Sequence, residues 1–137
     1  RYAPTCSIPM REAMSNTRTL LIHWNAGEAA RRLEQLRALG FDAQHAAPGG
    51  MPGIKAIAQD LPDVFVIDLG RLPSQGRAVA VALRGLKATR HVPIMFAGGV
   101  EEKIGKTREM FPDAVFAVWE SIGPALRQAQ LRPARRP

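Results

Sequence analysis

Five short apolar runs, each followed by a segment with helical periodicity, constrain the fold of this chain more than any other feature of its sequence. Short apolar runs without regular alternation of polar residues are typical of strands buried on both faces of a parallel sheet. Parallel strands joined by helices require right-handed crossovers. The pattern therefore predicts a doubly wound α/β sheet of five parallel strands. The expected strands are 19–24, 41–46, 64–68, 92–97 and 114–119.

The segments between these runs show where the helices are expected. In 27–40, Leu33, Leu36 and Leu39 fall on one stripe, and Gly40 is a suitable stop. A five-unit repeat of this kind is the flavodoxin-like form of the doubly wound fold, with strand order 2-1-3-4-5 in three α/β/α layers. The other helices are expected at about 54–59, over 75–86, over 101–111 with Gly105 weakening it, and after a Ser121 cap with Pro124 in the first turn.

The organisation along the chain follows from the same pattern. Residues 1–18 lack sustained periodicity and are expected to be an N-terminal extension, while 19–130 form one domain and 131–137 form a basic C-terminal tail. The chain starts at Arg1 rather than Met, which leaves room for a further domain outside this sequence.

Composition limits the class of protein. The 46% apolar content of 137 residues is enough for one core, but no apolar run is long enough for a membrane span. Cys6 is the only cysteine, so an intrachain disulfide is impossible, and the Cys and His spacing offers no zinc cluster. These features predict a cytoplasmic protein. The net charge of +7 favours acidic partners.

Asp68 ends the third apolar run, at the edge of the sheet where doubly wound folds bind their ligands. With strands one and three adjacent, Asp68 should lie near His23, Trp24 and Asn25, which end the first run. Two structural roles are open for Asp68: accepting hydrogen bonds from nearby backbone amides, or pairing with the His23 imidazole. No serine or cysteine nucleophile has an evident place beside such a pair.

From Thr19 to Ala129 the chain resembles the receiver domain of bacterial response regulators. The resemblance rests on the five-fold strand–helix order, on 66-VIDLGRLP-73 with a proline shortly after the strand-ending Asp68, and on 92-VPI-94 at the start of the fourth run. It implies a two-component signalling module in which Asp68 matches the residue that accepts a phosphoryl group from a histidine kinase.

The positions around Asp68 depart from that family. The acidic pair that holds a divalent ion is matched by His23, Trp24 and Asn25, so Mg²⁺ is expected only if the Asp68 pocket is functional. The remaining departures, by position, are Ala97 and Gly98 for the Ser or Thr of strand four, Trp119 for the Lys of strand five, and a spacing from Asp68 to Pro73 that is one residue longer. These changes predict a pseudo-receiver that is not an enzyme and holds no cofactor or metal.

Such a module would act through protein contacts. The family resemblance implies a partner face on helix four, strand five and helix five, which suits an acidic protein or a second copy of the chain. Arg132, Arg135 and Arg136 could add weak contact with nucleic acid, and no membrane contact is expected. The face would include Lys103, Lys106, Arg108, Phe116 and Arg127.

Two alternatives stay open on the sequence. Asp68 could be an authentic phosphoacceptor, as its position at the end of the third run suggests. The domain could instead bind a small anionic ligand or nucleotide at the strand ends, using Trp24, Trp119 and the glycine-containing loops at 47–53 and 98–99. A pocket filled by the two indoles would count against ligand binding, whereas an open cleft lined by them would favour it.

Overall fold

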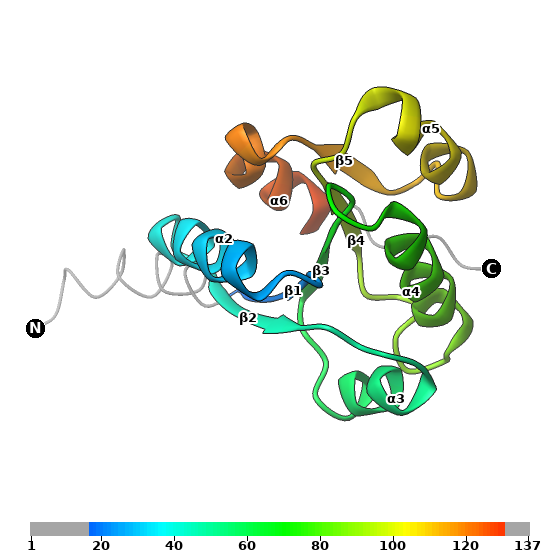
Figure 1. Cartoon of the computed structure of the whole chain (residues 1–137). Coiled ribbons are helices and arrows are strands. Elements are labelled where there is room, and N and C mark those ends of the chain that lie inside the picture. Colours follow the sequence, from blue (N-terminus) through cyan, green and yellow to red (C-terminus); the bar gives the residue numbers. More distant parts are fainter. Residues whose placement is uncertain (1–16, 131–137) are drawn as a thin grey trace, which may run out of the picture.

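The computed structural model describes residues 17–130, which form a five-stranded parallel sheet covered by helices on both faces (Figure 1). The strand order β2-β1-β3-β4-β5 confirms the predicted order 2-1-3-4-5. Cys6, Arg132, Arg135 and Arg136 lie outside the described residues. The strands are β1 (Arg18–Ile22), β2 (Asp42–Ala46), β3 (Val64–Asp68), β4 (Ile94–Ala97) and β5 (Val115–Ala117).

Four of the five strands are shorter than the apolar runs that predict them, and only β3 has the predicted bounds. β1 ends at Ile22 because Asn25 already caps the next helix, with its side-chain oxygen accepting a hydrogen bond from Glu28 N at 2.8 Å. β5 ends at Ala117 because the chain turns into a short 3₁₀ helix, η2 (Trp119–Ser121). The expectation that Trp24 and Trp119 are the last residues of strands is therefore wrong, and β4 likewise starts at Ile94 rather than at residue 92.

The helices form two layers. α2 (Ala26–Ala38) and α6 (Ile122–Gln130) cover one face of the sheet, whereas α3, α4 and α5 cover the other (Figure 1). Pro52 and Pro73 each stand in the first turn of a helix, where their missing N–H groups cost nothing. The second layer consists of α3 (Met51–Gln59), α4 (Pro73–Gly85) and α5 (Glu101–Met110). Among the described residues, no helix is long and apolar enough to cross a membrane.

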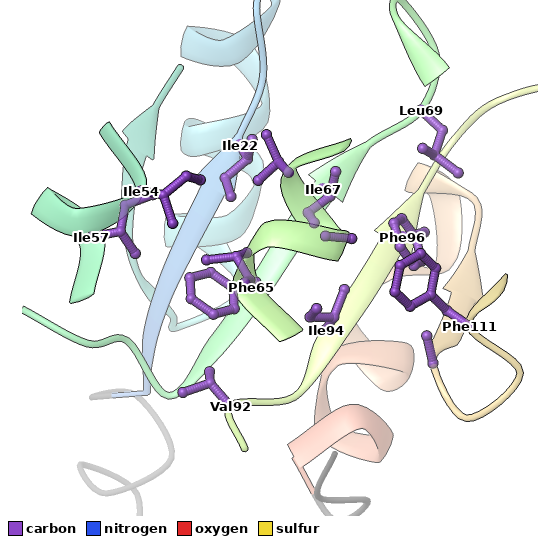
Figure 2. Close-up of a cluster of buried hydrophobic side chains, with 14 of the residues drawn as sticks. Ile22, Ile54, Ile57, Phe65, Ile67, Leu69, Val92, Ile94, Phe96 and Phe111 are labelled. Atoms are coloured by element: carbon purple, nitrogen blue, oxygen red, sulfur yellow. The ribbon is translucent and has the colours of Figure 1, made fainter. Parts of the chain in front are cut away.

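The two faces of the central strands build two separate cores. Phe65 and Ile67 of β3 point toward α3, α4 and α5, and Figure 2 shows them in this cluster with Ile54 and Phe96. Val64 and Val66 alternate with them and face the core under α2 and α6. By the same alternation, Asp68 is directed to the α2 and α6 side at the carboxyl end of its strand.

The free edge of β2 is covered by a side chain. Arg37, in the last turn of α2, donates to the carbonyl oxygen of Ala43 from Nη2 at 2.7 Å and from Nε at 3.1 Å. Arg37 thus occupies this carbonyl and places a charged side chain at the edge, which hinders pairing with an added strand at this position.

Candidate functional site

Asp68 lies buried at the end of β3, with only 2% of its surface exposed. Its Oδ2 accepts hydrogen bonds from Gly70 N at 3.0 Å and Arg71 N at 3.3 Å, in the loop that leads to α4. These amides stabilise the carboxylate and hold the loop against the strand end.

Trp119 binds the other carboxylate oxygen. Its indole Nε1 donates to Asp68 Oδ1 at 3.1 Å, and the ring is almost fully buried. Gln35 of α2 donates to the Trp119 carbonyl at 2.7 Å, and the Arg32 guanidinium stacks 4.6 Å from the ring centroid. Trp119 is thus held through both its carbonyl and its ring, and its indole N–H gives Asp68 a neutral donor.

His23 follows β1 and is fully buried beside Asp68. Its Nδ1 accepts a hydrogen bond from Asn25 N at 3.1 Å, so in the neutral ring the proton is on Nε2. That Nε2 lies 3.5 Å from Asp68 Oδ2 and 3.6 Å from Glu28 Oε2, and has no hydrogen-bond partner at normal distance. The Nε2–H group therefore points between two carboxylates.

Glu28 is the member of the site that the sequence reasoning missed. It stands in the first turn of α2, and its Oε1 accepts from Arg71 Nε at 3.0 Å. This hydrogen bond lowers the pKa of the Glu28 carboxyl, with His23 acting in the same direction and burial acting against both. A signal was present in the sequence, because a carboxylate three residues after the Asn25 cap must lie near the end of β1.

His23, Glu28 and Asp68 each offer one metal-ligating atom, and these atoms lie within 4.8 Å of one another. The hydrogen bonds around them do not fit an ion, however. A metal on Nε2 needs the lone pair there and a proton on Nδ1, yet Nδ1 accepts a hydrogen bond from Asn25 N–H. The Asn25 side-chain oxygen is also engaged in capping α2. The imidazole Nε2–H thus lies where a cation would have to contact the carboxylates.

The end of β4 offers Asp68 no hydroxyl. Ala97 pairs with Asp68 in the sheet and is fully buried, and Gly98 follows with φ of 77°. A Cβ on Gly98 would lie 3.4 Å from Asp68 Oδ1 and from the Trp119 ring. A hydroxyl-bearing residue at Gly98 would therefore meet both backbone strain and a crowded carboxylate.

Comparison with solved structures identifies this architecture. A response regulator receiver domain (CheY-like) from Methylobacillus flagellatus superposes with a TM-score of 0.68, covering 83% of this chain and 98% of that one at 22% identity. The chain has the CheY-like receiver fold. No family model matches it, and no curated protein matches it by sequence.

On the receiver fold, Trp24 and Trp119 do different things although both lie near the carboxyl ends of the strands. Trp24 is half-buried, and its Nε1 donates to the Pro48 carbonyl at 3.4 Å in the loop before α3. It packs against the core under α3, α4 and α5, while Trp119 belongs to the opposite core. The two indoles therefore do not line one cleft.

The proposed partner face of the receiver fold is only partly continuous. Lys106 is exposed on α5, and Arg108 stacks 4.8 Å from the centroid of half-buried Phe116. Arg127 instead stacks 5.9 Å from the ring of Phe41, on the α2 and α6 side. Of Lys103 only the backbone position in α5 is described.

Proposed function

We propose that this domain is a pseudo-receiver: a signalling module that works through protein contacts and is not phosphorylated on Asp68. The observation that carries the proposal is that both oxygens of the buried Asp68 carboxylate already accept hydrogen bonds from the protein. One oxygen accepts from the Trp119 indole and the other from the amides of Gly70 and Arg71.

Phosphorylation of Asp68 would require the carboxylate to attack a phosphorus atom while a cation offsets the charge on the phosphoryl oxygens. Asp68 is 2% exposed, so the donor has no open approach to it. His23 Nε2–H lies beside the two carboxylates that an ion would need, and the matching lysine position holds the neutral indole of Trp119. We infer that the pocket binds neither Mg²⁺ nor another cofactor.

The alternative of ligand binding at the strand ends receives less support. Trp119 fills its part of the pocket and is hydrogen-bonded to Asp68, and Trp24 fastens the loop before α3. The receiver fold and the exposed cations therefore support protein contacts best as the function. The net charge of +7 favours an acidic partner.

Incubation with acetyl phosphate or beryllofluoride in the presence of Mg²⁺ tests the proposal. We expect intact-mass spectrometry to show no phosphoryl adduct and Trp fluorescence to show no change on beryllofluoride addition. An active receiver domain treated in parallel provides the positive control. Stoichiometric modification that disappears in Asp68→Asn would instead establish an authentic phosphoacceptor.

A further inference from the structure

A groove of about 420 Å³ lies between α3 and α4, on the opposite face of the sheet from the Asp68 carboxylate. Its volume falls within the roughly 300–1,000 Å³ of ligand-binding clefts. None of the lining residues is charged. They are Pro48, Gly49, Gly50, Met51, Ile54, Gln75, Ala78, Val79 and Ala82.

The groove has a buried apolar floor and an exposed apolar rim. Ile54 and Val79 form the floor and belong to the core, in which Figure 2 shows Ile54. Met51 of α3 and Ala78 of α4 line its sides; Met51 is 46% exposed, and Ala78 is also exposed. Burying such side chains against a partner would release apolar surface from water.

The wall made by the loop before α3 is held in place. Trp24 Nε1 donates to the Pro48 carbonyl, and a Cβ on Gly53 would come within 3.1 Å of Pro48. The loop therefore packs closely on the first turn of α3. A wall that is already formed lowers the entropic cost of binding.

The charges of the two helices indicate the kind of partner. Together α3 and α4 contain three cations and no acidic residue, in a chain of net charge +7. Lys55 is exposed one turn after Met51 on the same side of α3, while Arg84 is paired with Asp113 and Arg77 donates to Thr107 of α5. The neutral groove thus has one exposed cation beside it and no acidic residue on its two helices, which favours an apolar segment with acidic flanks over one with basic flanks.

The occupant should be a helix rather than a strand. The groove lies between two helices, and only its loop wall at 48–50 could offer main-chain groups to an extended segment. At the free edge of β2, Arg37 already occupies the Ala43 carbonyl, which hinders an added strand there. A helix satisfies its own backbone hydrogen bonds and needs only an apolar stripe to bind.

We propose that the α3–α4 groove is a docking site for an amphipathic helix of a partner protein, with leucine-like anchors on one face and acidic residues beside them. This inference rests on the proposed function in assigning protein contacts to the domain. Its success or failure is independent of Asp68 chemistry, because the groove does not include the Asp68 pocket.

The probe is a synthetic helical peptide with Leu at positions i, i+3, i+4 and i+7 and Glu at most other positions, titrated into the ¹⁵N-labelled chain. We expect amide shifts centred on Met51, Ala78 and Ala82, with binding that weakens as salt rises. A matched peptide with Lys in place of each Glu should bind at least about tenfold more weakly.

Two variants locate the site. Ala78→Glu puts a bulky anion in the groove at an exposed helical position and should weaken the acidic peptide by about tenfold or more. Ala30→Glu makes the same change at an exposed position of α2, on the other face of the sheet, and should leave binding unchanged. Urea unfolding of both variants verifies that they are folded.

Three results would overturn the proposal. They are equal binding of the acidic and basic peptides, amide shifts that avoid α3 and α4, and the absence of any shift at millimolar peptide. Sedimentation equilibrium of the chain alone tests whether a second copy of the chain occupies the groove. Dimerisation that is abolished by Ala78→Glu would assign the groove to that second copy.

Discussion

Trp119 and Trp24 are both near the carboxyl ends of the strands, but their indole N–H groups have unequal partners. Trp119 donates to a buried carboxylate at 3.1 Å, whereas Trp24 donates to a backbone carbonyl at 3.4 Å in a half-buried setting. A hydrogen bond to a buried charge is worth more, and losing it leaves the charge poorly solvated. The Asp68 pocket should therefore depend on the Trp119 N–H.

The Trp119→Phe variant tests this dependence. It keeps an aromatic ring but removes the donor to Asp68 Oδ1, and we expect a loss of about 1.5–3 kcal/mol in the free energy of unfolding. Urea denaturation followed by far-UV circular dichroism measures it, since removal of Trp119 alters the fluorescence signal.

Trp24→Phe is the matched control, with an expected loss of about 0.5–1 kcal/mol because its bond is long, neutral and half-buried. Equal losses in the two variants would mean that ring volume, rather than the hydrogen bond to Asp68, accounts for the stability.

Strand order placed His23 beside Asp68, because β1 and β3 are neighbours, and the receiver resemblance matched Trp119 to the lysine position of the same pocket. It missed Glu28, whose reach into the pocket depends on the rotation of α2 after its Asn25 cap. It also did not anticipate which indole would bind Asp68, since strand ends alone do not place η2. Periodicity predicts the backbone topology, whereas the partners of a side chain depend on how each helix is positioned and rotated on the sheet.

At the scale of elements, the connection from β4 to α5 is fixed by backbone conformation. Gly98 and Gly99 have φ of 77° and 87°, which only glycine adopts at little cost. A Cβ on Gly99 would also lie 2.6 Å from Ile104 Cγ2, in the first turn of α5. Gly105 differs, since it is inside α5 with open space where a Cβ would be.

Substitution of Gly99 by alanine and substitution of Gly105 by alanine should have opposite effects on stability. Gly105→Ala adds a better helix former without a clash and should raise the free energy of unfolding by about 0.5–1 kcal/mol. Gly99→Ala should lower it by about 1–3 kcal/mol through backbone strain, with the contact to Ile104 adding to the loss. Thermal and urea unfolding measure both. Stabilisation by Gly99→Ala would contradict the left-handed conformation at that residue.

The ends of the elements were predicted less well than their order. α3 begins at Met51 rather than near residue 54, because Pro52 fits the first turn and its missing N–H needs no partner. β4 begins two residues later than the apolar run 92–97, since Pro93 cannot donate to the sheet. Hydrophobic periodicity marks which residues are buried, and buried residues continue past the last strand pair.

For the molecule as a whole, the pocket joins parts that are far apart in the sequence. His23 follows β1, Glu28 starts α2, Asp68 ends β3 and Trp119 lies after β5. An ion held among these carboxylates would bind the folded state and not the unfolded chain. It would therefore raise the stability of the entire domain by mass action. Thermal stability therefore reports whether the pocket can hold a cation.

We expect the melting temperature of the wild-type chain to be the same in EDTA and in about 10 mM Mg²⁺, because the His23 Nε2–H group lies beside the carboxylates.

In the His23→Asp variant we expect the melting temperature to rise when Mg²⁺ is added. A third carboxylate beside Glu28 and Asp68 should destabilise the domain in EDTA, and Mg²⁺ should restore stability, by about 2.7 kcal/mol at 100 times its Kd. His23→Asn is the control, since it removes the imidazole without adding charge and should lose stability that Mg²⁺ does not restore. Differential scanning calorimetry with and without Mg²⁺ separates the cases, and a wild-type melting temperature that rises with Mg²⁺ would show that the pocket accepts an ion despite His23.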